Sequence, residues 1–253
     1  MTTDTDNQLL ERYASDGSEP AFRELVERHI NLVHSAALRE ARGDASLAED
    51  ITQAVFTELA RRATTLVQHP ALAGWLYTCV RRMTANVRRS EDRRQRREQE
   101  AFIMNELLGP DPTDALWQQV RPALDDVMHE LNETDRTAVV LRFFEGRNLK
   151  EVGVALGLSE NAARMRVDRS LDKLRELLSR RGVKSTASTL AAVLVAGAAT
   201  SAPSALAATV ATGALSAAAA AGSATFTFAK FLSLAKTKTA AVGAVLIVAA
   251  VLV

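Results

Sequence analysis

The residues best suited to chemistry lie in the stretch "LKEVGVALGLSENAARMRVDRSLDKLRELL", from Leu149 to Leu178. Its second half carries three arginines on one short helical pattern, Arg164, Arg166 and Arg169. A guanidinium can donate two hydrogen bonds to O6 and N7 of one guanine in the major groove of DNA. The stretch therefore predicts a helix that reads bases, and an ordinary helical hairpin with a solvated basic face is the alternative.

Two glycines in the same stretch indicate a helix-turn-helix. Gly153 supplies a small residue inside the first helix, and Gly157 suits a turn that needs a positive φ. Ser159 is the expected N-cap of the second helix. The apolar residues that would lock the two helices together are Val152, Leu156, Leu158, Ala163 and Val167. The side chains expected to contact DNA are Asn161, Arg164, Met165, Arg166, Asp168 and Arg169.

Charge is distributed along the chain in alternating blocks, although the whole chain has a net charge of only +1. Residues 1–60 have a net charge of −7, residues 61–97 of +8, residues 98–136 of −8 and residues 137–184 of +5. Two basic blocks separated by an acidic one suggest contact with a polyanion at two places. Solvated helix faces are the alternative explanation.

The sequence offers no pattern for catalysis or metal binding. The four histidines are scattered, and none has a second histidine at the i,i+4 spacing of a helical metal site. There is no Cys-x-x-Cys pair, no glycine-rich phosphate loop and no nucleophile elbow. We therefore expect no metal, no cofactor, no catalytic residue and no enzymatic activity. His29 and His34 fall on partly apolar helix faces and are expected to pack.

Cysteine content and the N-terminus indicate the compartment. The single Cys79 excludes an intrachain disulfide framework, which fits a reducing environment. The opening "MTTDTDNQLL" lacks the basic patch and the apolar core of a signal peptide. Residues 1–184 are expected in the cytoplasm.

The elements that must position these side chains read as helices throughout residues 1–184. Apolar residues recur at spacings of three and four, as in "AFRELVERHINLVHSAALREA", and no strand-length alternation occurs. The next helix, "SLAEDITQAVFTELARRA", has Ser46 as its expected N-cap and Glu49 in capping-box position. A third helix is expected after Pro70, and it becomes rich in arginine from Arg81 onward. The sequence predicts an all-α fold.

Two breaks divide the helices. The segment "LLGPDPTD", residues 107–114, has two prolines, a glycine and no periodicity, and it predicts a linker or domain boundary. A second break at Leu131–Glu133 precedes a helix that should end near Gly146, with Thr134 as its candidate N-cap.

At this point the residues resemble a known family. The stretch from Leu149 is similar to the promoter-reading helix-turn-helix, region four, of extracytoplasmic-function sigma factors, and "LNETDRTAVVLRFFEG" resembles the helices before it. In the first half, "AEDITQAVFTELARR" is similar to the family's helix that binds core RNA polymerase. "LAGWLYTCVRRMTANVRR" resembles its helix that captures the melted minus-ten element. Both motif sets occur in the family's order, over residues 5–182.

The resemblance implies a role for two further sets of residues. Those that would dock on core RNA polymerase are Ala48, Glu49, Asp50, Gln53 and Phe56. Those that would contact the minus-ten element are Trp75, Tyr77, Arg81, Arg82, Asn86 and Arg89. Aromatic rings can stack on unpaired bases and arginines can neutralise phosphates, although core packing is the alternative for Trp75 and Tyr77.

Two residues depart from the family pattern. Arg82 stands where the family commonly has Asn, and Asp168 where it often has an aromatic residue or His. A carboxylate repels phosphate but can accept a hydrogen bond from the amino group of cytosine. These departures affect the promoter sequence that is read.

The resemblance also implies the domain organisation. A region-two helical bundle would occupy residues 5–100, a linker residues 101–119 and a region-four domain residues 120–182. Beyond the resemblance, the composition of residues 185–253 predicts an Ala-rich, hydrophobic helical tail. The implied function is promoter-specific initiation with core RNA polymerase, promoter DNA and an anti-sigma factor as partners. The alternatives are a helix-turn-helix regulator that acts without polymerase and a membrane-anchored adaptor that binds only protein.

The tail leaves two interpretations open. From Ser185 to Ala229 it has no charged residue, and it ends in "TAAVGAVLIVAAVLV". The first interpretation is membrane association, with a helical hairpin broken near Pro203 and flanking basic residues kept in the cytoplasm. The last 15 residues would cover only about 22 Å of an about 30 Å hydrocarbon core. Partial insertion, packing on the Ala-rich tract and continuation of the chain beyond Val253 are the alternatives for this segment. The second interpretation is a soluble low-complexity tail.

Overall fold

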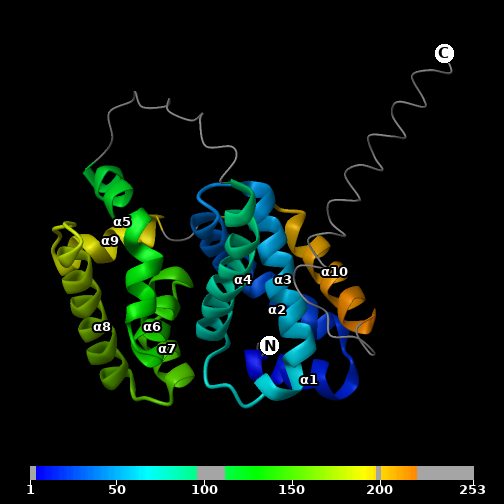
Figure 1. Cartoon of the computed structure of the whole chain (residues 1–253). Coiled ribbons are helices and arrows are strands. Elements are labelled where there is room, and N and C mark those ends of the chain that lie inside the picture. Colours follow the sequence, from blue (N-terminus) through cyan, green and yellow to red (C-terminus); the bar gives the residue numbers. More distant parts are fainter. Residues whose placement is uncertain (1–3, 96–111, 198–200, 221–253) are drawn as a thin grey trace.

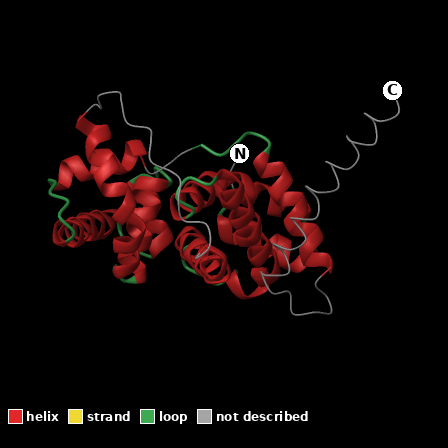
Figure 2. Cartoon of the chain, turned by 45° about the horizontal axis from the view of Figure 1, so that its top comes forward, coloured by secondary structure: helices red, strands yellow, loops and turns green. Residues whose placement is uncertain are grey.

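The computed structural model describes residues 4–95, 112–197 and 201–220, with the side chains of residues 86–95, 112–115 and 197 left out. Within these ranges the chain forms helices joined by turns and loops, and no strand occurs there (Figure 2). The predicted all-α fold is confirmed. Two groups of helices lie side by side, and the tail crosses from one to the other (Figure 1).

The first domain, residues 4–95, is a helical bundle. Its helices are α1 (Asp6–Asp16), α2 (Glu19–Glu40), α3 (Ala45–Leu66) and α4 (Leu72–Gln95). Phe22 of α2 and Phe56 of α3 have no exposed surface and lie in the core. Full burial of a phenylalanine side chain stabilises a fold by about 1.5–3 kcal/mol, so these two residues hold α2 and α3 in place.

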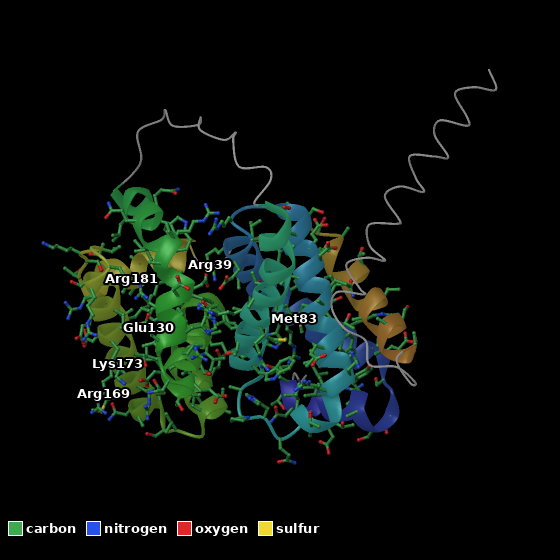
Figure 3. The ribbon with its side chains drawn as sticks, viewed as in Figure 1. Arg39, Met83, Glu130, Arg169, Lys173 and Arg181 are labelled. Atoms are coloured by element: carbon green, nitrogen blue, oxygen red, sulfur yellow. The ribbon has the colours of Figure 1, made fainter. Side chains whose placement is uncertain are left out.

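The second domain, residues 112–180, carries the predicted helix-turn-helix. Its helices are α5 (Pro112–Glu130), α6 (Glu133–Val139), a short π-helix η1 (Val140–Phe144), α7 (Leu149–Leu156) and α8 (Glu160–Arg180). Arg181, which follows α8, forms an ion pair with Glu130 at the end of α5 (Figure 3). This pair ties the end of α8 to the helix beside it.

The C-terminal part of the predicted linker, residues 101–119, is helical. Residues 112–119 belong to α5, because a proline is compatible with the first turn of a helix, where its missing N–H has no partner to lose. Pro112 therefore begins the helix and does not mark a loop. Residues 101–111 lie outside the described residues.

Two predicted N-caps are wrong by two residues. Asp44, not Ser46, caps α3, and its side chain accepts a hydrogen bond from the Leu47 N–H at 3.0 Å. Asn132, not Thr134, caps α6 by accepting from the Asp135 N–H at 2.8 Å. Asp and Asn are as effective as Ser at this position, so the first suitable residue with an extended backbone ends the loop.

Close helix packing joins the two domains. Gly74 of α4 lies against Thr137 of α6 with no room for a Cβ atom between them. Arg39 of α2 lies on the side of the first domain that faces the second (Figure 3), and both its Nε and Nη2 donate to Asp125 of α5, at 2.9 and 3.0 Å. These contacts hold the molecule in a closed arrangement.

The tail forms two helices that pack on different domains. Helix α9 (Ala187–Gly197) lies against α5 and α8, and helix α10 (Leu206–Ala220) lies against α3 and α2 (Figure 1). The predicted hairpin around Pro203 is therefore wrong for these residues, because each helix buries its apolar face on protein. Among the residues described, no helix combines the length and apolar character needed to cross a membrane. The terminal apolar segment lies outside the described residues.

Candidate nucleic-acid interface

The turn between α7 and α8 has the backbone geometry expected from its glycines. Gly157 adopts a left-handed conformation with φ 66°, which confirms its predicted role. At Gly153 the fit is tighter, because a Cβ atom would lie 2.7 Å from the carbonyl oxygen of Leu158. The Leu158 N–H donates to the Gly153 carbonyl oxygen at 2.8 Å. A side chain at Gly153 would push these two backbone segments apart.

Side-chain caps fix the start of each helix. The predicted N-cap Ser159 is confirmed, since its Oγ accepts a hydrogen bond from the Ala162 N–H at 3.2 Å. Asn148 begins α7 with a reciprocal capping box that includes Glu151. This second cap was not predicted, although an Asn three residues before a Glu is its sequence signal.

The outward face of α8 is open to solvent. The predicted DNA-contacting residues that are exposed on it are Asn161, Arg164, Met165, Asp168 and Arg169. Met165 is unusual because 48% of this large apolar side chain is exposed. Arg169 and Lys173 follow each other along the same helix (Figure 3). The face thus combines cationic and apolar groups, as a surface that contacts both phosphates and bases requires.

Arg166 does not belong to this open face. Its Nη1 donates to Asp135 of α6 at 3.0 Å, and Lys173 contacts the other carboxylate oxygen of Asp135 at 2.5 Å. Burial raises the pKa of Asp135, but the hydrogen bonds from Lys173 and Arg166 lower it further, so the net shift is downward. This guanidinium holds α8 against α6, and its predicted contact with DNA stays a prediction.

Two of the predicted minus-ten residues, Tyr77 and Arg81, are bound by the second domain. Tyr77 is 2% exposed, and its hydroxyl donates to Asp125 of α5 at 2.5 Å. Burial and the Asp125 carboxylate raise the pKa of Tyr77 well above its usual value, so the hydroxyl keeps its proton. In this arrangement Tyr77 is packed in the core, and its predicted contact with the minus-ten element stays a prediction. Trp75 is half-buried and packs against the same core.

The arginines and the asparagine of α4 differ in their surroundings. Arg81 forms an ion pair with Asp126 of α5 at 2.9 Å, whereas Arg82 is exposed. Asn86 and Arg89 are in α4, but their side chains lie outside the described residues. Only Arg82 among the predicted minus-ten residues has a side chain that is described as exposed.

The predicted polymerase-docking residues of α3 divide into buried and accessible groups. Ala48 and Phe56 have no exposed surface, so they support the helix from its core side and cannot touch a partner. Glu49 is exposed, and Asp50 and Gln53 are half-buried. The Gln53 Nε2 donates to the Val210 carbonyl oxygen of α10 at 3.2 Å. The accessible part of the predicted site is thus Glu49, Asp50 and Gln53.

A buried ion cluster between the domains was not predicted. His29 of α2 has no exposed surface, and its Nδ1 and Nε2 contact Glu145 at 2.6 Å and Asp6 at 3.1 Å. Arg147 bridges the same two carboxylates, at 2.8 Å from Glu145 and 3.1 Å from Asp6. Burial would lower the pKa of His29, but the two carboxylates outweigh it and raise this pKa to about 9. His29 is therefore a charged partner as well as a packed residue.

His34 is the packed histidine that the sequence predicted. It is 5% exposed, and its Nδ1 has no hydrogen-bond partner among the described residues. Burial lowers the pKa of His34, which favours the neutral ring. No group of His, Cys, Asp and Glu side chains suited to a metal ion occurs in the described part of the chain.

Two family models match the chain, one on each domain. The model described as Sigma-70 region 2 matches residues 25–94, and the model described as Sigma-70, region 4 matches residues 127–176. The first match contains α3 and most of α4, and the second contains the helix-turn-helix. Both matches end before the tail.

Several curated proteins are similar to the chain over the same two domains. RNA polymerase sigma factor CarQ of Myxococcus xanthus is 35% identical over 175 residues, which cover 67% of this chain and 95% of CarQ. ECF RNA polymerase sigma factor SigE of Mycolicibacterium smegmatis is 28% identical over 194 residues, 73% of this chain and 72% of SigE. RNA polymerase sigma factor NccH of Alcaligenes xylosoxydans xylosoxydans is 27% identical over 186 residues, 70% of this chain and 97% of NccH. CarQ and NccH have almost no length left for a counterpart of the tail.

Proposed function

The chain belongs to the extracytoplasmic-function sigma factors, which direct RNA polymerase to promoters, and from this premise we propose which of its surfaces makes each contact. The outward face of α8 reads the minus-thirty-five element. The accessible residues of α3, namely Glu49, Asp50 and Gln53, form a row that docks on core RNA polymerase. Helix α4 contacts the melted minus-ten strand. Polymerase carries out the chemistry, and we assign no catalytic residue to this chain.

The observation that carries the minus-thirty-five assignment is the composition of the exposed face of α8. Arg164 and Arg169 are exposed there, while the neighbouring Arg166 is held by Asp135. An exposed arginine beside the N-terminal half of a recognition helix can reach guanine O6 and N7. Met165 adds an apolar surface that suits the methyl group of thymine.

Contact with the minus-ten strand requires the two domains to separate. Tyr77 and Arg81 are bound to Asp125 and Asp126 of the second domain in the closed arrangement. A base cannot stack on Tyr77, nor a phosphate pair with Arg81, until those bonds break. We assign the closed arrangement to the chain before it binds polymerase, and an open one to the promoter complex.

The domain boundaries follow from the helices. We assign residues 5–95 to region two and residues 112–182 to region four, which moves the start of region four from 120 to the first residue of α5. The matched residues 25–94 and 127–176 lie inside these limits.

Promoter-specific transcription in vitro tests the function. Core RNA polymerase is supplied with the purified chain and a pool of promoter fragments, and we expect transcripts from a subset that shares a minus-thirty-five sequence. Binding to DNA without any association with core polymerase would favour the regulator that acts alone. The match to region two supports the sigma-factor interpretation, because a polymerase-independent regulator has no use for α3.

Membrane association of the tail now depends on residues 221–253. The described tail helices pack on protein, so we propose any membrane contact only for the terminal segment "TAAVGAVLIVAAVLV". Fractionation of the full chain beside a 1–220 truncation checks this. Equal recovery of both in the soluble fraction would remove the proposal. A separate anti-sigma factor is a further partner that the family membership suggests.

A further inference from the structure

Helix α10 covers the side of the first domain formed by α2 and α3. It lies along both helices in the closed molecule (Figure 1). Leu206, Val210, Ala211 and Ala214 are buried there, with exposed fractions of 7%, 1%, 1% and 0%. These residues follow one another at steps of four, one and three positions, so they share one face of α10, and that face makes the contact.

Small residues let α10 approach α3 closely at Gln53. A Cβ atom at Gly213 would lie 2.9 Å from both Nε2 and Oε1 of Gln53, so the absence of a side chain makes room for this amide. The Gln53 Nε2 in turn donates to the Val210 carbonyl oxygen at 3.2 Å. Farther along, Leu215 and Ala218 line a cavity together with Arg61 of α3.

A second hydrogen bond fixes the start of the segment. The Ala202 N–H donates to Oδ1 of Asn31, an exposed residue of α2, at 2.9 Å. The segment is thus held at two points by side chains of the first domain, through its backbone. Because both contacts are made to the backbone of the segment, they fix the position of α10 along α3. The close approach at Gly213 requires a residue without a side chain at that position.

We propose that α10 occupies the surface on which core RNA polymerase docks, so that residues 206–220 act as an intramolecular competitor of polymerase. The inference rests on the proposed function in one respect, the assignment of α3 as the docking helix. Gln53 belongs both to that predicted docking set and to the α10 contact, and Gly213 lies so close to its amide that a partner cannot take the same place while α10 is bound.

The position of α10 in the chain allows it to leave α3 and return, because it stays attached to the second domain through α9. Helix α10 follows α9, which packs on α5 and α8 of the second domain, so the tail bridges the two domains. Release of α10 from α3 therefore frees the docking row and removes one of the links that keep the domains closed. The contact contains no ion pair among the described residues, and it relies on few large side chains, so polymerase can displace it.

The similarity to CarQ fits an added regulatory segment. The shared region covers 95% of CarQ but 67% of this chain, so docking and promoter recognition do not require the tail. A segment that is dispensable for the shared activity, and that covers the surface for that activity, is placed to restrain it.

A matched pair of substitutions in the full chain tests the proposal. Ala214→Arg places a charge at a fully buried position of α10, whereas Ala208→Arg adds the same side chain to the exposed face of the same helix. The affinity for core RNA polymerase is measured by titration for the wild type and both variants. We expect Ala214→Arg to bind core RNA polymerase about 10-fold more tightly or better. If α10 covers the site in about nine molecules of ten, only about one in ten can bind, and the apparent affinity of the wild type is about 10-fold lower. Ala208→Arg should match the wild type.

The outcomes distinguish the competition by α10 from the proposed function of the chain. Equal affinity of all three proteins, with promoter-specific transcription intact, overturns the competition and leaves the proposed function standing. Failure of all three to bind core polymerase overturns the proposed function and the competition with it. Thermal unfolding of each variant confirms that both domains remain folded, which is expected because α10 belongs to neither domain.

A fluorescence measurement reports the position of α10 without disturbing its contact. Donor and acceptor dyes are attached through Ser15→Cys on α1 and Thr212→Cys on α10, both exposed positions. The native Cys79 is buried and the pKa of its thiol is raised to about 12, so it does not compete for the dyes. Addition of core polymerase should lower energy transfer in this protein. Unchanged transfer at saturating polymerase would show that α10 stays in place, and the competition would be excluded.

Discussion

Neighbouring arginines on α8 differ in what holds them. Arg164 and Arg169 are exposed, whereas Arg166 donates to the buried carboxylate of Asp135. Loss of Arg166 would remove one of the two cations, Arg166 and Lys173, that face the buried Asp135 carboxylate, and a buried charge that loses a partner destabilises the fold. The same residue type therefore serves recognition at two positions and stability at a third.

This division predicts distinct effects of three substitutions. Arg164→Ala and Arg169→Ala should each weaken binding to minus-thirty-five DNA by about 1–3 kcal/mol if the contact to guanine is bidentate. Arg166→Ala should instead lower the free energy of unfolding and change DNA affinity less. Fluorescence anisotropy on promoter and scrambled duplexes measures the first effect. Equal losses on both duplexes would identify a phosphate contact.

For Gly153→Ala, helix propensity and steric contact predict opposite changes in the free energy of unfolding. Alanine is favoured over glycine inside a helix by about 1 kcal/mol, so Gly153→Ala would stabilise α7 if space were available. The carbonyl oxygen of Leu158 is 2.7 Å from the Cβ position, and backbone cannot yield easily. We expect the substitution to reduce the free energy of unfolding by about 1–3 kcal/mol. Chemical denaturation measures it, and a more stable variant would contradict the tight turn.

At the scale of elements, α3 has a buried side and a partly accessible row. Ala48 and Phe56 face the core, while Glu49 is exposed and Gln53 contacts α10. A helix can support the bundle and present a partner surface because residues three or four apart share a face. Substitutions on the two sides should therefore separate folding from docking.

Glu49→Arg tests the docking side of α3. We expect its affinity for core polymerase to fall at least about 10-fold, or ~1.4 kcal/mol, with DNA binding by α8 retained. Glu27→Arg, at an exposed position of α2, is the charge-matched control. Titration with core polymerase gives both affinities. If the two variants lose affinity equally, net charge and not the α3 row determines docking.

At the scale of the whole molecule, the buried ion cluster couples domain closure to pH. His29 lies between Asp6 and Glu145, and these carboxylates also face Arg147, with Arg28 beside Asp6. The pKa of His29 is raised from 6.5 to about 9 in the folded chain. Its contribution to stability is complete below pH 6.5 and is lost as the pH rises through about 9. The pKa values of Asp6 and Glu145 are lowered, so their contribution is lost only in acid.

We therefore expect the closed arrangement to weaken between pH 6.5 and 9. The loss in the free energy of unfolding should be on the order of 1–3 kcal/mol, because the open or unfolded chain releases the proton of His29 first. The melting temperature and the radius of gyration, measured across this range, report it. His29→Gln keeps a hydrogen-bonding side chain without the charge and should flatten the dependence. An unchanged pH dependence in that variant would assign it to another group.

The sequence by itself determined the helices, the helix-turn-helix and the family. Helical periodicity, a glycine at a left-handed turn and a serine N-cap act between residues a few positions apart, so the sequence displays them directly. The errors at this level were small, as at Asp44 and Pro112, where several residues of similar chemistry compete for one boundary. The exposed face of α8 also followed from spacing, except at Arg166, whose guanidinium is bound to Asp135.

Only the tertiary structure decided which functional side chains are free. Tyr77 with Asp125, His29 with Glu145 and Gln53 with Val210 are pairs separated by 48, 116 and 157 positions. Helical periodicity does not predict such a pair, because each partner has the type and spacing of an ordinary polar or core residue of its own helix. Whether the polymerase-docking row is open or covered depends on where α10 packs. The position of α10 depends on how its side chains pack against helices that are distant in the chain. The local sequence of α10 does not predict that packing.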